Sequence, residues 1–167
     1  MNLFNIFLSL ILSITLCSCY TSEVPISNSK NSQIDTEVLG EWGTFDKEGK
    51  LYLVIKISAL DNYNYVVSGT NFKDVSLSNF IAHSSTINNQ KYINLRELDS
   101  NKEESYIFFK YELKNDSLLT YGLDGNQFIK KFKSSKQFKR YIKKNSKVFN
   151  EKFKEAYHFI KINSSPK

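Results

Sequence analysis

Few residues of this 167-residue chain could form cross-links or bind a metal ion. The two cysteines, Cys17 and Cys19, stand near the N-terminus, and the two histidines, His83 and His158, are far apart in sequence. A zinc site needs three or four His, Cys or carboxylate ligands at workable spacing, and we find no such set. We therefore predict no metal site, no cofactor and no disulfide, and we expect both histidines at the surface or at a rim.

Motifs that carry common enzymatic chemistry are also missing. The chain has no G-x-S-x-G sequence and no Gly-rich phosphate loop. Acid pairs such as Glu97 with Asp99 stand near expected strand ends, where carboxylates are more often solvated charges than general acids. We predict that the protein is not an enzyme.

Glycine and proline are scarce, with six and two residues, which excludes collagen-like and Pro-rich classes. Aromatic residues make up 14% of the chain and favour strands and large buried rings. The length that remains after an N-terminal leader suits one domain with a real core.

The first 18 residues contain no charged side chain and are almost continuously apolar from Leu3 to Leu16. A membrane-spanning helix needs roughly 20 apolar residues. This run is shorter and ends in small residues, which is typical of a secretory signal peptide. We assign 1–18 to that signal peptide.

The residues that follow decide the type of leader. Leu16-Cys17-Ser18-Cys19 resembles the lipobox of bacterial lipoproteins, although the Lys or Arg that normally begins such leaders is absent. The resemblance implies a diacylglyceryl group on the Cys19 thiol, usually with an acylated amine, and a membrane partner reached through this lipid. Tyr20 stands where an Asp would suggest retention in the inner membrane, so the resemblance implies the periplasmic face of the outer membrane in a Gram-negative host. The alternative is an uncleaved anchor helix with both cysteines unmodified.

The segment after Cys19 is polar, rich in Ser and Asn, and lacks a periodic apolar face up to Asp35. Such composition favours disorder. We predict that 19–35 comprises the lipidated cysteine and a flexible tether with a mean reach of roughly 20–25 Å.

The remaining body, 36–163, shows short runs in which apolar residues alternate with polar ones, separated by turn residues. We expect strands within 38–45, 51–57, 63–67, 80–87, 93–95, 107–113, 118–121 and 156–162. Ser134 with Gln137 has the spacing of a capping box, and Phe138, Tyr141 and Ile142 continue as an amphipathic helix. The predicted fold is mainly β: an antiparallel meander that closes into a small barrel, with a C-terminal helical segment before the last strand.

Positive charge gathers at the C-terminal end. The region 126–167 carries 13 Lys and Arg against two acids, a net charge of +11, which leaves −5 for the remainder. We favour a solvated helix face and rank contact with anionic headgroups second. Nucleic-acid binding suits the charge, but an exported lipoprotein rarely meets nucleic acid, so we predict no such partner.

Gly40-Glu41-Trp42, at the start of the first strand, resembles the G-x-W signature of lipocalins. In that family the Trp plugs the barrel base, and the order of meander, late helix and closing strand is similar. The T-D-Y-type turn of the family is absent, with Thr120-Tyr121-Gly122 in that region. The late Arg that packs on the Trp is also missing, and Lys161 is a poor substitute for it.

The resemblance implies a lipocalin-like cup for a small apolar molecule. The aromatic residues that could line such a cup are Trp42, Tyr63, Tyr65, Phe109, Tyr111 and Tyr121. Large rings more often fill a barrel than line a cavity, and we favour that interpretation. Two functions stay open: a membrane-anchored binding module for a small apolar ligand, or a structural lipoprotein whose filled barrel docks envelope proteins.

Overall fold

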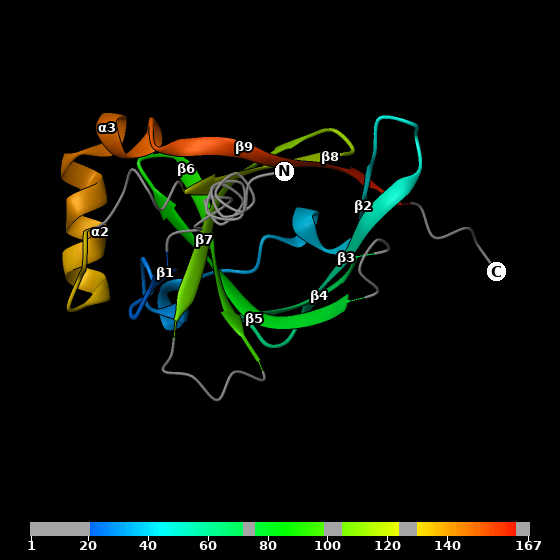
Figure 1. Cartoon of the computed structure of the whole chain (residues 1–167). Coiled ribbons are helices and arrows are strands. Elements are labelled where there is room, and N and C mark those ends of the chain that lie inside the picture. Colours follow the sequence, from blue (N-terminus) through cyan, green and yellow to red (C-terminus); the bar gives the residue numbers. More distant parts are fainter. Residues whose placement is uncertain (1–20, 72–75, 99–104, 124–129, 163–167) are drawn as a thin grey trace, which may run out of the picture.

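The computed structural model describes residues 21–71, 76–98, 105–123 and 130–162. The predicted signal peptide and Cys19 lie outside these ranges. The described residues form a closed antiparallel barrel of eight strands, in which the first and last strands pair with each other (Figure 1). The eight strands are β2 (Gly40–Phe45), β3 (Leu51–Ala59), β4 (Tyr65–Asn71), β5 (Ser76–Ile87), β6 (Gln90–Glu97), β7 (Tyr106–Lys114), β8 (Ser117–Leu123) and β9 (Phe153–Lys161).

Each of these eight strands pairs with its neighbours in sequence. In addition, β9 pairs with β2, and this pairing closes the ring. The turn between β5 and β6 consists of Asn88 and Asn89, both with positive φ. Two central residues of positive φ make a tight hairpin turn, and Asn tolerates this backbone better than most residues. The predicted meander and barrel are confirmed.

The helical segment stands between β8 and β9, as predicted, and comprises α2 (Ser135–Lys144) and α3 (Ser146–Asn150). The Ser134 hydroxyl accepts a hydrogen bond from the Gln137 backbone N–H, and the Gln137 side chain accepts one from the backbone N–H of Lys133. These bonds satisfy N–H groups at the start of the helix, which have no partner within it.

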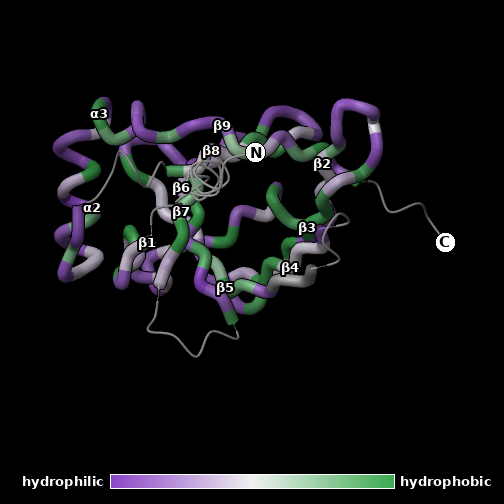
Figure 2. The backbone as a smooth tube through the Cα atoms, viewed as in Figure 1, coloured by the Kyte–Doolittle hydropathy of each residue, from purple (hydrophilic) through white to green (hydrophobic). Residues whose placement is uncertain are grey.

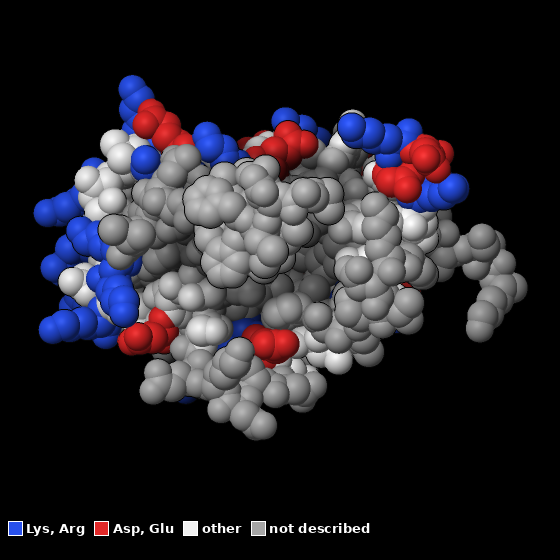
Figure 3. All heavy atoms as spheres, in the orientation of Figure 1, with Lys and Arg blue, Asp and Glu red and all other residues white. Residues whose placement is uncertain are grey.

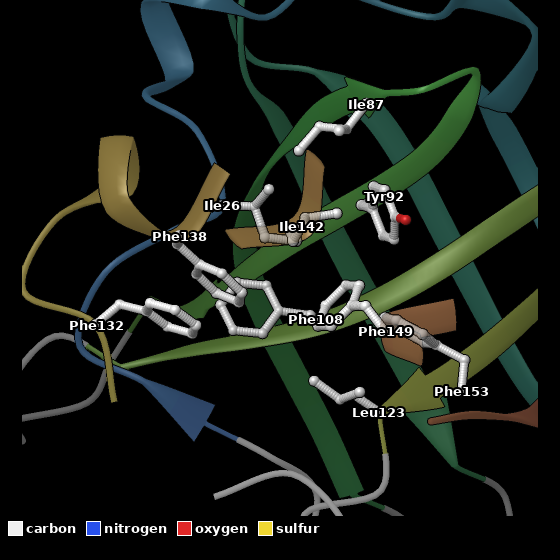
Figure 4. Packing of buried hydrophobic residues seen from close by; sticks show 10 residues of the cluster. All are labelled: Ile26, Ile87, Tyr92, Phe108, Leu123, Phe132, Phe138, Ile142, Phe149 and Phe153. Carbon is white, nitrogen blue, oxygen red and sulfur yellow. The ribbon is translucent and has the colours of Figure 1, made fainter. Parts of the chain in front are cut away.

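Two hydrophobic cores result, one on each side of the barrel wall. Period-two alternation sends every second side chain inward, and the inner core consists of Val38, Trp42, Ile57, Tyr65, Val67, Ala82, Tyr111, Leu118 and Phe159. The outer core lies between the wall and the helices (Figure 4) and consists of Ile26, Ile87, Tyr92, Phe108, Leu123, Phe132, Phe138, Ile142, Phe149 and Phe153. Most of α2 is hydrophilic, as its largely purple tube in Figure 2 shows, because only one narrow stripe of the helix reaches this core.

The residues before the barrel correct one prediction. We expected a flexible tether up to Asp35, but 21–39 packs against the barrel, and we call this segment the strap. It contains β1 (Thr21–Ser22), which pairs with β7, and two 3-10 helices, η2 (Ser29–Asn31) and η3 (Thr36–Val38). Ile26 in the strap is fully buried in the outer core. Among the described residues, the folded body therefore begins at Thr21 rather than at 36.

Composition misled the prediction because the polar residues of the strap find specific partners. The Ser27 hydroxyl shares a hydrogen bond with Ser85, and the Ser32 hydroxyl shares one with Ser84. Buried polar groups are tolerated when they are hydrogen-bonded. A Ser-rich segment can therefore pack against a wall that supplies matching polar groups.

Candidate functional site: a cavity inside the barrel

The barrel contains a partly open apolar cavity of about 360 Å³. Its volume lies at the lower end of the range of roughly 300–1,000 Å³ for small-molecule sites. Most of the lining is hydrocarbon from inward-facing strand positions. The lining residues are Val38, Leu53, Ile55, Ile57, Val67, Gly69, Asn71, Phe80, Ile93, Leu95, Ile107, Phe109, Tyr111, Leu118, Thr120, Tyr157 and Phe159.

The two ends of the barrel differ. At one end β4, β6 and β8 finish, and the lining residues there, such as Asn71, Leu95 and Ile107, are only partly buried. At the other end the strap crosses the barrel, and its Val38 is a buried part of the cavity wall. We call the first the open end and the second the closed end.

A polar cluster fills the closed end. The Lys91 ammonium lies 2.7 Å from a carboxylate oxygen of Asp35, and the Tyr111 hydroxyl donates to that same oxygen at 3.2 Å. The backbone N–H of Asp35 donates to the Tyr65 hydroxyl at 2.6 Å. The cluster therefore ties the strap to β4, β6 and β7.

Both phenols in this cluster stay protonated at neutral pH. Burial raises the pKa of Tyr111 far above its usual range, and the negative charge of Asp35 raises it further. Burial is also the largest cause of the raised pKa of Tyr65. Tyr111 lines the cavity, but its hydroxyl is already engaged by Asp35, so the ring contributes an apolar surface at depth.

Trp42 is buried at the start of β2 and belongs to the inner core. Its indole N–H donates to the Val38 carbonyl in the strap at 2.8 Å, which holds η3 across the closed end. The Lys161 ammonium lies 5.3 Å from the centre of the indole rings, within the range of a cation–π contact. Lys161 thus contacts the Trp from β9, although we expected it to be a poor substitute for an Arg there.

Gly40 begins β2 with φ of +126°, a conformation that L-residues rarely adopt. A side chain at this position would also come within 3.4 Å of the Lys161 aliphatic chain. The backbone conformation therefore favours glycine as the first residue of the G-x-W sequence.

The structure brings together only part of the predicted aromatic site. Phe109 and Tyr111 line the cavity, whereas Trp42 and Tyr65 are buried in the inner core beside it. Tyr63 is 43% exposed, because it lies in the turn between β3 and β4 and not on a strand. It contributes to a separate polar groove between strap and α2.

Tyr121 does not line the cavity either. It follows Thr120, which faces inward, so it points to the outer side and packs against the outer core. Lys110 lies over its ring, 4.2 Å from the centroid.

The predicted site, which consisted of aromatic residues, did not include most of the cavity wall. Aliphatic residues such as Ile55, Ile93 and Leu95 contribute much of the surface. The signal was present in the period-two pattern, which places Leu53, Ile55 and Ile57 on one face of a strand. The predicted site contained only aromatic residues, which were selected for their size. The face of the strand on which a residue lies, and not its size, determines whether it lines a barrel.

His83 corrects another expectation. It is buried on the outer wall beneath the strap, where its Nε2 lies 2.7 Å from the Ser27 carbonyl oxygen. Because the carbonyl can only accept, the ring nitrogen donates. Burial lowers the pKa of His83, so the ring is neutral at pH 7. His158 is exposed, as predicted.

Asn94, next to His83 on the wall, has no exposed surface and uses its whole amide. Its carbonyl accepts from the backbone N–H of Ile26 at 2.8 Å, and its amino group donates to the His83 carbonyl and the Ser85 hydroxyl. The residue thus joins the strap to β5 and β6. Sequence patterning did not single it out.

The basic residues of the C-terminal region gather over α2 (Figure 3). Lys136, Arg140, Lys143 and Lys144 are exposed on the helix. Within 21–71, 76–98, 105–123 and 130–162 there is no group of three or more His, Cys, Asp or Glu residues that could hold a metal ion. Nor does any helix in these ranges have the length and apolar character needed to cross a membrane.

Comparison with known proteins gives no relative: no family model, no curated protein and no solved structure matches the chain. The properties of the site therefore rest on its own geometry.

Proposed function

We propose that the protein is a lipid-anchored envelope protein whose barrel binds a small apolar ligand. The anchor is the diacylglyceryl group on Cys19, and the ligand site is the apolar cavity. The observation that carries the binding part is this cavity of about 360 Å³, which a barrel filled by its own side chains would lack.

The lining supports an apolar ligand in particular. At depth the wall consists of Ile57, Val67, Leu118 and Phe159. The Tyr111 hydroxyl is engaged by Asp35, and the Thr120 hydroxyl donates to the Tyr157 carbonyl. A polar ligand group would lose its water there and find no free partner, which is costly. Hydrocarbon would gain about 25 cal/mol for each Å² of apolar surface removed from water.

The architecture supports the resemblance to lipocalins as well. A G-x-W sequence at the first barrel strand, a strap that crosses the closed end beside Trp42, and a basic residue over the indole all agree with that arrangement. The proposed localisation is the periplasmic face of the outer membrane, and it rests on the leader sequence.

Ligand binding can be tested with the soluble domain from Tyr20 onward. Native mass spectrometry should show a retained small molecule, and a fluorescent fatty acid should bind when the domain is delipidated. A persistently ligand-free protein that does not bind the probe would favour the alternative, a structural lipoprotein that docks other envelope proteins.

A matched pair of variants locates the site. Gly69 lines the cavity, and a Cβ there would lie at ordinary contact distance, 3.6 Å, from Ile55. Gly69→Leu should therefore fill the cavity and abolish probe binding. Ser68→Leu adds the same side chain to the outer side of β4 and should leave binding unchanged.

The anchor has its own test. The intact mass of the mature protein should correspond to a chain that begins at Cys19 and carries acyl groups. Cys19→Ser should lose lipid and stay unprocessed. If this variant still partitions with membranes as a shortened chain, the anchor is not at Cys19.

A further inference from the structure

We infer that the lipid anchor holds the open end of the barrel against the membrane surface, so that the cavity faces the bilayer. This inference rests on the proposed lipidation of Cys19. The partner is a phospholipid surface, and the contact is made by the rim of the open end.

The position of β1 carries the argument. Thr21 pairs with Ile107 and Ser22 pairs with Tyr106, at the first residues of β7. Ile107 lines the cavity, and β7 begins at the open end, beside the end of β6. Because β1 is antiparallel to β7, Ser22 lies nearer the rim than Thr21. Thr21, the first described residue, lies level with the second residue of β7 and so is still close to the rim of the cavity.

The distance from this point to the anchor is short. Cys19 precedes Thr21 by two residues, which span at most about 7 Å when fully extended. A flexible tether up to Asp35 would have let the barrel stand off by roughly three times as much. Because the strap packs against the barrel, this additional reach is absent.

The strap is fastened close to the anchor, so β1 does not swing freely. Ser22 is buried, and four residues later Ile26 has no exposed surface and donates its backbone N–H to Asn94. The next residue, Ser27, accepts a hydrogen bond from His83. The strap is thus fixed to the barrel wall from Ser22 to Ser27.

The rim of the open end also offers apolar surface to a bilayer. Phe45, Leu51 and Leu98 lie where β2, β3 and β6 meet this end, and each is at least 36% exposed. Exposed apolar residues such as Leu60 also occur in the turn between β3 and β4, at the closed end. Exposed apolar residues therefore do not show which end of the barrel faces the membrane. The short link between Thr21 and Cys19 favours the open end.

The mature lipoprotein would have no free thiol, because Cys17 is removed with the leader and Cys19 is modified. A single introduced cysteine can therefore be labelled specifically. Leu98→Cys at the open end and Leu60→Cys at the closed end form a matched pair, since the two leucines are 51% and 52% exposed. Each full-length variant is purified as the mature lipoprotein, labelled with a fluorophore and reconstituted into phosphatidylethanolamine–phosphatidylglycerol vesicles containing a doxyl-labelled lipid.

We expect the doxyl lipid to quench the label at residue 98 several-fold more strongly than the label at residue 60. Equal quenching, or stronger quenching at residue 60, would overturn the inference. Intact-mass analysis of the same samples reports whether the anchor is present, and probe binding by the soluble domain reports on the cavity. Failure of the orientation is thus distinguishable from failure of the proposed function.

A longer link tests the cause of the orientation. A Gly/Ser insertion of about 16 residues between Tyr20 and Thr21 would add a mean reach of roughly 20–24 Å. The difference in quenching between the two labels should then disappear. If the difference persists at full size, the short link does not orient the barrel, and the inference fails.

Discussion

At the scale of single residues, the buried polar groups of the outer wall determine how the strap is held. His83 and Asn94 both connect the strap to β5 or β6, and neither was identified from the sequence. A histidine between alternating residues gives no sign of whether its side of the strand faces solvent. Here that side faces the strap, whose packing the sequence analysis did not anticipate.

His83 should make stability depend on pH. Its pKa in the folded protein is lowered from 6.5 by burial, so below pH 6.5 the unfolded chain binds a proton that the folded protein does not. The free energy of unfolding should therefore fall as the pH decreases from 6.5 to the folded-state pKa. Urea unfolding at pH 7.5 and 5.5 measures this loss.

Two variants assign that pH dependence. His83→Gln removes the titrating group and should flatten the profile between these pH values. His158→Gln, at the exposed histidine, should leave the profile unchanged. An unchanged slope in His83→Gln would show that another group is responsible.

Asn94 should be among the most sensitive polar positions. Asn94→Ala leaves the buried N–H of Ile26 without its acceptor, a loss that costs about 1–3 kcal/mol. It also removes the amide hydrogen bonds to the His83 carbonyl and the Ser85 hydroxyl. We expect the free energy of unfolding to fall by about 2–4 kcal/mol in urea titrations. Asn31→Ala, at an exposed position of the strap, should change it by no more than about 0.5 kcal/mol.

At the scale of elements, α2 is held by a few rings. Phe138 has no exposed surface, stacks on Phe132 with centroids 4.1 Å apart, and meets Phe108 edge to face at 5.3 Å (Figure 4). Phe138→Ala should cost about 3–5 kcal/mol of stability, measured by thermal or urea unfolding. Lys136→Ala, on the exposed side of the helix, should have an effect below about 0.5 kcal/mol. Comparable losses in both variants would contradict the packing described for α2.

The elements themselves were largely predictable. Alternating apolar residues identified the strands, Asn88-Asn89 identified a turn, and Ser134 with Gln137 identified the start of a helix. These signals are local, because they depend on residues two to four positions apart. The strap was missed because its order depends on contacts such as that of Ser27 with Ser85, 58 residues away.

At the scale of the whole molecule, barrel closure followed from the need to pair the edge strands, and the structure confirms it. The cavity could not be predicted in the same way. Whether inward side chains fill a barrel depends on their summed volumes and on its cross-section, and neither can be read from the period of the pattern. Small inward residues such as Gly69 are the sequence features that leave room.

The strap should also make the molecule unfold as one unit. Because it contacts the outer core through Ile26 and the inner core through Val38, loss of either core removes support from the other. We expect a single calorimetric transition, with equal calorimetric and van't Hoff enthalpies. Two resolved transitions would show that the barrel interior and the helical layer are energetically independent.

The pairing of β1 with only two residues of β7 has a mechanical consequence. If lipid chains hold the N-terminus, any pull on the protein from the envelope side loads this short strand first. Once β1 detaches, the segment between it and the next buried side chain, that of Ile26, extends before the force reaches the barrel. The fold would thus give way in stages under force, although we expect heat or urea to unfold it in a single transition.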